Sequence, residues 1–148
     1  MHKDFMLITL ADDDEDDRLL FTDAFDELKI NTVVNTFNNG KLLMDYLMEP
    51  ENILPHIIFL DLNMPIMNGI ECLKEIKKNE RLKNIAIAIY STSSANDDVE
   101  ETFVLGANVY IKKPDDFKKL KNVLNEVITV NWQYYTSGLN KENFLLQL

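Results

Sequence analysis

Short apolar segments alternate with amphipathic segments along most of the chain. The apolar segments are short enough for buried strands, and apolar residues at helical spacing between them predict helices. The predicted strands are Phe5–Ala11, Thr32–Phe37, His56–Leu60, Ile85–Tyr90 and Asn108–Ile111. The predicted helices are Asp16–Leu28, Lys41–Met48, Ile70–Lys77, Ala95–Val104 and Asp115–Thr129. Five successive strand–helix units predict an α/β fold whose parallel sheet is covered on both faces.

Acidic residues follow two of the predicted strands at the point where each strand ends. Asp12 and Asp13 follow the first strand, and Asp61 follows the third. Ligands of such sheets bind outside the carboxyl ends of the strands, so we expect these side chains to meet in one crevice. Three carboxylates repel one another and need protons or a cation, and hard oxygen ligands favour Mg²⁺. The pattern indicates phosphate chemistry on an aspartate.

Composition narrows the class of protein. The chain has 148 residues, enough for one domain, and a net charge of -10, which argues against non-specific binding to nucleic acid or anionic membranes. Its single cysteine, Cys72, excludes an intramolecular disulfide, fits a reducing compartment and is expected to be an inert apolar side chain. The sequence shows neither a cleavable signal pattern nor an apolar run of transmembrane length, so we expect a cytoplasmic protein.

Four motifs at strand ends carry a family resemblance. They are ADDDEDD, DLNMPIMNG, YSTSS and YIKKP, in this order along the chain. Together they make residues 4–130 resemble the receiver domain of two-component response regulators. The resemblance implies a flavodoxin-like, doubly wound (βα)5 sandwich with strand order 2-1-3-4-5. It also implies a phosphoacceptor switch that is not an enzyme beyond slow self-dephosphorylation.

The resemblance assigns roles to the residues at the strand ends. Asp61 resembles the phosphoacceptor, which receives a phosphoryl group from a sensor histidine kinase or a phosphotransfer protein. Asp12 and Asp13 resemble the acidic pair that holds Mg²⁺ together with Asp61 and the backbone carbonyl of Asn63. Lys113 resembles the lysine that pairs with a phosphoryl oxygen.

Further residues resemble those that change conformation in this family and those that set the rate of hydrolysis. Ser91 resembles the switch hydroxyl, and Tyr110 occupies the position of the switch aromatic residue. Thr92, Ser93 and Asn63 flank the expected entry path of hydrolytic water, and Thr92 is bulkier than the residue often found there. The peptide bond between Lys113 and Pro114 is often cis in this family.

Some assignments stay open at this point. Asp14 replaces Asp13 as the second metal-site acid if the first strand ends one residue later. Asp14 to Asp17 are otherwise expected to be solvated acids at a helix start, where the helix dipole favours them. Ser93 and Ser94 are better candidates than Ser91 for capping the next helix.

Residues 131–148 extend past the expected receiver domain at residues 1–130 and are too short for an output domain. Output is then expected through a partner protein or a homodimer, at the face formed by the last two predicted helices and the last strand. The aromatic residues of this extension either pack back on the last helix or form an arm that binds a partner. They are Trp132, Tyr134, Tyr135 and Phe144.

Two alternative functions compete with the response regulator. A phosphohydrolase of the haloacid-dehalogenase kind also uses an aspartate and Mg²⁺, but it needs a second acid two residues after the nucleophile, where this chain has Asn63. A docking module that works without phosphorylation requires the loss of site residues, and none is lost.

Overall fold

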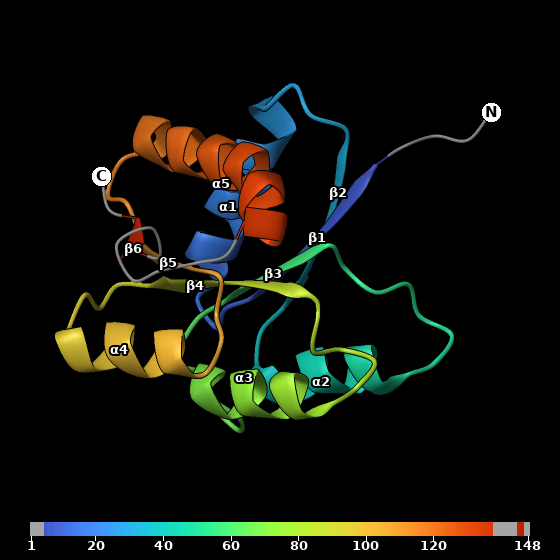
Figure 1. Cartoon of the computed structure of the whole chain (residues 1–148). Coiled ribbons are helices and arrows are strands. Elements are labelled where there is room, and N and C mark those ends of the chain that lie inside the picture. Colours follow the sequence, from blue (N-terminus) through green and yellow to red (C-terminus); the bar gives the residue numbers. More distant parts are fainter. Residues whose placement is uncertain (1–4, 138–144, 147–148) are drawn as a thin grey trace.

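The computed structural model describes residues 5–137 and 145–146, which form a parallel sheet between two layers of helices (Figure 1). The strand order is β2-β1-β3-β4-β5-β6, so the five predicted strands have the expected order 2-1-3-4-5. The strands are β1 (Met6–Ala11), β2 (Thr32–Phe37), β3 (Ile57–Leu60), β4 (Ala86–Ser91), β5 (Val109–Lys112) and β6 (Leu145–Leu146).

Five helices cover the two faces of the sheet. Helices α1 and α5 lie on one face, and α2, α3 and α4 lie on the other (Figure 1). The helices are α1 (Glu15–Glu27), α2 (Gly40–Met48), α3 (Gly69–Lys78), α4 (Asn96–Val104) and α5 (Phe117–Ser137). The prediction of a doubly covered α/β sheet is confirmed.

Each face of the sheet has its own apolar core, because alternate side chains of a strand point to opposite faces. In β3, Ile58 and Leu60 join the core beneath α2 and α3, whereas Ile57 and Phe59 join the core beneath α1 and α5. All four are buried, which explains why this strand is apolar at every position. The central strand therefore ends at Asp61 with little freedom to move.

The helix that follows the central strand begins at a tight contact. Asn68 and Glu71 form a capping box at the start of α3. A Cβ atom at Gly69 would collide with the carbonyl oxygen of Asp61, so only glycine lets the helix begin so close to the strand end. These two features fix the loop between β3 and α3.

Two features of the C-terminal region differ from the prediction. Helix α5 continues to Ser137 rather than ending at Thr129, and β6 was not predicted. Strand β6 pairs with β5, with Leu145 opposite Tyr110. The predicted packing of Trp132, Tyr134, Tyr135 and Phe144 concerns side chains outside the described part of the chain.

Two further observations concern the described residues as a group. Their peptide bonds are all trans, including Lys113–Pro114, where the family often has a cis bond. None of their helices combines the length and the hydropathy needed to cross a membrane.

Candidate functional site

Three carboxylates converge at the carboxyl ends of β1 and β3. Asp12, Asp13 and Asp61 each place an oxygen within 4.8 Å of the other two. The backbone N–H of Asp61 donates to the carbonyl of Ala11, so the ends of the two strands are held in register. The sequence prediction that these acids meet in one crevice is confirmed at the level of geometry.

Burial makes two of these carboxylates hard to ionise. Asp12 is fully buried, and Asp61 is 5% exposed. Burial raises the pKa of Asp61 to about 6; Lys113 opposes this effect and the negative charge of Asp12 adds to it. Burial likewise raises the pKa of Asp12. The cluster is therefore a site where a positive charge is stabilised.

Lys113 supplies one positive charge to the cluster. Its Nζ atom lies 2.8 Å from Asp12 Oδ2, 2.7 Å from Asp17 Oδ2 and 3.7 Å from Asp61 Oδ2. Burial alone would lower the pKa of Lys113, but the carboxylates of Asp12 and Asp17 outweigh this effect and raise it. Lys113 is thus an ammonium ion held beside the carboxylates of the cluster.

The role of Asp17 differs from the prediction. Asp17 was expected to be a solvated acid at the helix start, but its carboxylate accepts a hydrogen bond from Lys113 Nζ at 2.7 Å. The helical phase explains this contact, because Asp17 is one turn before the buried Phe21 and two turns before the buried Ala24. That spacing was the signal in the sequence that could have placed Asp17 on the inner face.

The neighbouring acid Asp14 has a structural role. It is the N-cap of α1, and its carboxylate accepts a hydrogen bond from the N–H of Asp17. Its own N–H donates to Asp12 Oδ1 at 3.0 Å. Arg18 also supports the site, because its guanidinium donates to the carbonyl of Asp12 at 2.8 Å; sequence reasoning did not identify this contact. Asp13 is the acid that joins the cluster.

The donor set of the cluster fits a divalent cation. Asp12 Oδ2 lies close to Lys113 Nζ but accepts no well-directed hydrogen bond within the described part of the chain. A buried carboxylate oxygen in this situation retains capacity for a metal ion. Three carboxylates are the hard oxygen ligands that Mg²⁺ and Mn²⁺ prefer.

The residues predicted for the switch lie on two neighbouring strands, Ser91 at the end of β4 and Tyr110 near the start of β5. The buried Ser91 Oγ accepts a hydrogen bond from the N–H of Ser93, and the Ser91 carbonyl accepts one from the N–H of Lys113. Tyr110 is fully buried, and its hydroxyl donates to the carbonyl of Ser93 at 2.7 Å. Tyr110 therefore anchors the loop between β4 and α4 from the inside.

The capping prediction for α4 needs a correction in detail. The N-cap residue is Ala95, which makes no side-chain capping bond. Ser93 Oγ instead accepts from the N–H of Ala95 and donates to Asp98 at 2.7 Å. Ser93 therefore supports the helix start from two residues upstream, while Thr92 is exposed.

On the other side of the crevice, the N–H of Asn63 approaches Asp61 Oδ1 at 3.4 Å. The Asn63 side chain is exposed. Asn63 and Thr92 thus belong to the two loops that flank Asp61.

Comparison with known proteins agrees with this geometry. Residues 8–125 match the response regulator receiver domain family. The chain is 34% identical to response regulator Rcp1 of Synechocystis sp., over 77% of this chain and 80% of Rcp1. It is 32% identical to the probable methanogenesis regulatory protein FilR2 of Methanothrix harundinacea, over 84% of this chain and 83% of FilR2.

Solved structures with a similar fold are also response regulators. The Mn²⁺-bound form of Rcp1 is similar with a TM-score of 0.77 and 29% identity, over 86% of this chain and 94% of Rcp1. The phosphorylated cyanobacterial phytochrome response regulator RcpA has a TM-score of 0.78 and 28% identity, over 93% of this chain and 98% of RcpA. The phosphohydrolase and the phosphorylation-independent docking module are not favoured. The chain belongs to the response regulator receiver domain family of two-component signalling.

Proposed function

We propose that Asp61 is the phosphoacceptor of this response regulator, with a sensor histidine kinase or a histidine phosphotransfer protein as the donor. The observation that carries the proposal is the meeting of Asp12, Asp13 and Asp61 within 4.8 Å, next to the ammonium group of Lys113. An ionised carboxylate among fixed positive charge is the arrangement that phosphoryl transfer to an aspartate requires.

In the proposed reaction, a carboxylate oxygen of Asp61 attacks the phosphorus of a phosphohistidine. The new bond joins oxygen to phosphorus, the phosphorus–nitrogen bond breaks, and the electron pair returns to the imidazole nitrogen. Lys113 already lies 3.7 Å from Asp61 Oδ2, so its ammonium group is placed to pair with a phosphoryl oxygen of the acyl phosphate.

Asp12, Asp13, Asp61 and the backbone carbonyl of Asn63 are the proposed ligands of Mg²⁺. When bound, the cation neutralises negative charge on the phosphoryl group and on the carboxylates. Its binding also favours the ionised form of Asp61, whose pKa burial raises to about 6. Mn²⁺ in the similar Rcp1 structure supports a divalent cation in general.

The proposed switch begins at Ser91 and Tyr110. Ser91 Oγ accepts a hydrogen bond from the N–H of Ser93, whose carbonyl accepts one from Tyr110, so a movement of Ser91 toward the phosphoryl group would be passed to both residues. The change then reaches the face of α4, β5 and α5, where we place a downstream protein or a homodimer. Asn63, Thr92 and Ser93 are proposed to set the rate of hydrolysis.

We further propose a cytoplasmic receiver unit at residues 1–130, with residues 131–148 as an extension. This unit acts as a switch with only slow self-dephosphorylation, and not as an enzyme with turnover. Its charge of -10 gives no reason to expect nucleic-acid or membrane partners.

The experiment is intact-mass analysis after incubation with acetyl phosphate, with and without Mg²⁺. The expected result is a single phosphoryl adduct in the wild type that needs Mg²⁺ and is lost in Asp61→Asn. Beryllofluoride binding, followed by ¹⁹F NMR, covers the case in which acetyl phosphate is a poor donor. No adduct and no beryllofluoride binding would overturn the proposal.

A further inference from the structure

A short strand of the C-terminal region covers one edge of the sheet. The strand order ends with β4-β5-β6, so β5 would be the edge strand on this side without β6. In the parallel register, Leu145 lies opposite Tyr110 and Leu146 lies opposite Ile111 (Figure 1). An edge strand presents a row of open N–H and C=O groups that can pair with another strand. Here a segment of the same chain occupies that edge.

The pairing of β6 is shorter than the pairing on the other side of β5. Strand β4 pairs with all four residues of β5, from Val109 to Lys112, whereas β6 has two residues. A backbone hydrogen bond contributes little net free energy, and short terminal elements open more often than the centre of a sheet. Strand β6 can therefore leave β5 while the other five strands stay paired.

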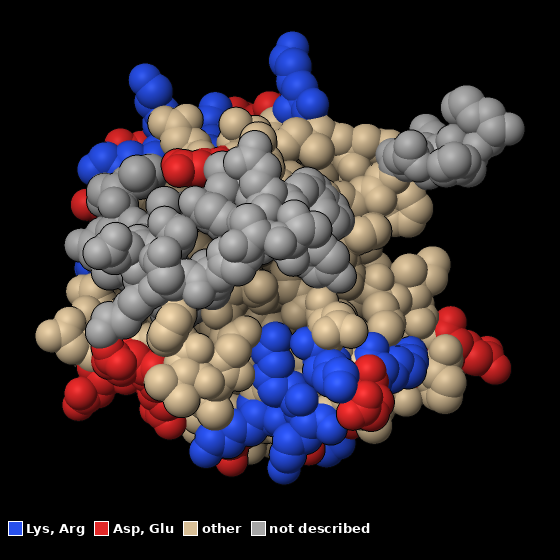
Figure 2. Space-filling model, in the orientation of Figure 1, with Lys and Arg blue, Asp and Glu red and all other residues tan. Residues whose placement is uncertain are grey.

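Charge on the neighbouring helix does not hold β6 in place. Residues 144–148 read FLLQL and have no charged side chain. Helix α4 contacts β5, and Figure 2 shows Asp and Glu side chains over this helix at the lower left of the view. Its acids are Asp97, Asp98, Glu100 and Glu101, and residues 96–104 include no Lys or Arg. Opening of β6 therefore breaks no ion pair with α4.

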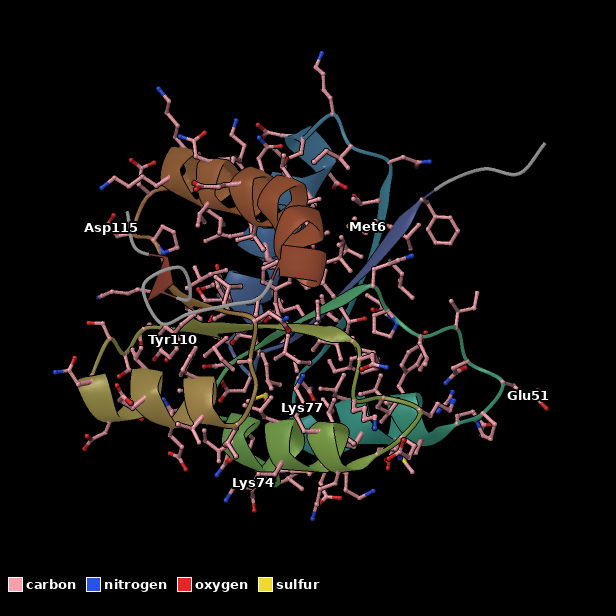
Figure 3. All side chains as sticks on the ribbon, in the orientation of Figure 1. Met6, Glu51, Lys74, Lys77, Tyr110 and Asp115 are labelled. Carbon is pink, nitrogen blue, oxygen red and sulfur yellow. The ribbon has the colours of Figure 1, made fainter. Side chains whose placement is uncertain are left out.

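The residue opposite the start of β6 belongs to the proposed switch. Tyr110 lies at this edge of the sheet (Figure 3), and it pairs with Ile89 of β4 on one side and with Leu145 on the other. Its hydroxyl donates to the carbonyl of Ser93, whose N–H donates to Ser91 Oγ. Two hydrogen bonds thus connect the switch hydroxyl to the residue with which β6 pairs.

The position of β6 conflicts with output through the same face. We place the downstream partner on the face of α4, β5 and α5, and β5 lies between these two helices (Figure 1). Extended segments of partner proteins commonly bind a sheet by adding a strand to an open edge. Such binding at β5 requires that β6 first leaves.

We propose that β6 is an autoinhibitory strand, which covers the edge of β5 in the unphosphorylated protein and is released when Asp61 is phosphorylated. Release opens this edge to an extended segment of the downstream partner. The signal passes from Ser91 through Ser93 and Tyr110 to the pairing of Tyr110 with Leu145. The inference rests on the proposed function of Asp61.

The first test determines whether β6 protects β5, in the full chain and without a phosphodonor. Leu145→Pro combined with Leu146→Pro removes both N–H groups of β6, whereas the control, Leu145→Ala combined with Leu146→Ala, keeps them. Hydrogen exchange of residues 109–112 is measured by NMR. At least one of these amides is expected to exchange about fivefold or more faster in the proline variant than in the alanine variant. The amides of β2, at the other edge of the sheet, should exchange equally in both variants.

The second test measures the coupling of β6 to the phosphorylation site. If beryllofluoride and Mg²⁺ at Asp61 release β6, then loss of β6 favours beryllofluoride binding by the same factor, because coupling is reciprocal. The proline variant is therefore expected to bind beryllofluoride about fivefold or more tightly than the alanine variant, measured by ¹⁹F NMR. Beryllofluoride should also speed exchange of residues 109–112 in the wild type.

Three results would overturn the proposal. They are equal exchange of residues 109–112 in the two variants, equal beryllofluoride affinity of the two variants, and exchange in the wild type that depends on protein concentration. The last result would show that a second copy of the chain supplies β6.

Two controls keep the tests decisive. Faster exchange in β2 as well as β5 would reveal unfolding of the double variant, and Leu146→Pro is then compared with Leu146→Ala. Failure of wild type and variants alike to bind beryllofluoride would refute the proposed function of Asp61 and, with it, release by phosphorylation. The exchange comparison would still decide whether β6 covers β5.

Discussion

Lys113 is bonded to Asp17 at 2.7 Å, a full ångström closer than it lies to the nearest carboxylate oxygen of Asp61. A phosphoryl group on Asp61 would therefore share the Lys113 ammonium group with the carboxylates of Asp12 and Asp17. Asp17 competes for the same ammonium group.

This competition predicts that Asp17→Asn tightens beryllofluoride binding in the presence of Mg²⁺ by about threefold. The amide keeps the shape of the side chain but removes the charge that holds Lys113. Asp16→Asn is the matched control, because Asp16 is an exposed acid on the same turn of α1. Equal affinities of Asp17→Asn and Asp16→Asn, measured by fluorine NMR, would contradict the prediction.

Asp61→Asn is expected to stabilise the metal-free protein by about 1–3 kcal/mol at pH 7. Burial raises the pKa of Asp61 from 3.8 to about 6, so the folded state binds this proton more tightly than the unfolded state. The favourable contribution is complete below about pH 4 and is lost as the pH rises through about 6.

Denaturant unfolding at pH 5 and pH 7 checks this prediction, and the advantage of Asp61→Asn should shrink at the lower pH. Asp23→Asn, at an exposed position of α1, is the control and should change the free energy of unfolding by less than about 0.5 kcal/mol. A variant less stable than the wild type at pH 7 would show that burial of the Asp61 carboxylate is not costly.

If Asp13 rather than Asp14 binds Mg²⁺, substitutions of these two residues should differ in their effect on stabilisation by Mg²⁺. Mg²⁺ at about 100 times its Kd should add about 2.7 kcal/mol to the free energy of unfolding of the wild type. Asp13→Asn should remove most of this increment. Asp14→Asn should keep it, because Asp14 is the N-cap of α1 rather than a member of the cluster. Thermal unfolding with and without Mg²⁺ measures both increments, and the reverse ranking would assign the metal to Asp14.

Tyr110→Phe removes the hydroxyl that holds the carbonyl of Ser93 at 2.7 Å. The expected cost is about 1 kcal/mol, with faster hydrogen exchange in the loop between β4 and α4. Tyr46→Phe is the control, because the hydroxyl of Tyr46 donates to the carbonyl of Ile53 at an exposed position. Exchange in the β4–α4 loop that is unchanged in Tyr110→Phe would contradict an anchoring role.

Ile66→Asn is expected to stabilise the protein by about 1 kcal/mol, because Asn tolerates positive φ better than a β-branched residue. Ile53→Asn is the matched control, since Ile53 is 65% exposed and Ile66 is the one described non-glycine residue with positive φ. Urea unfolding measures both. A gain of the same size at Ile53 would assign the effect to surface polarity rather than to backbone strain.

The fold and the centre of the site were predictable because strand ends in a parallel sheet share one edge. Asp12, Asp61 and Lys113 each follow an apolar strand, so their meeting required only the strand order. The contact of Asp17 with Lys113 depends on helical phase, which the prediction did not apply to the first turn of α1. Its spacing from Phe21 contained that information.

Other features of the structure could not be predicted from patterns in the sequence. Strand β6 has two residues, too few for any periodicity, and its pairing with Tyr110 and Ile111 depends on where α5 directs the chain. The positive φ of Ile66 contradicts the preference of isoleucine, so residue preference alone points the wrong way at that position.

The single cysteine of this chain can report on local opening of the folded protein. Cys72 is fully buried beneath α2, and burial raises the pKa of its thiol to about 12. A thiolate is the species that alkylating reagents attack, so the folded protein should be inert to them. The rate at which an alkylating reagent labels Cys72 would then measure how often the α2–α3 core opens. This measurement needs neither a substitution nor a fluorescent dye.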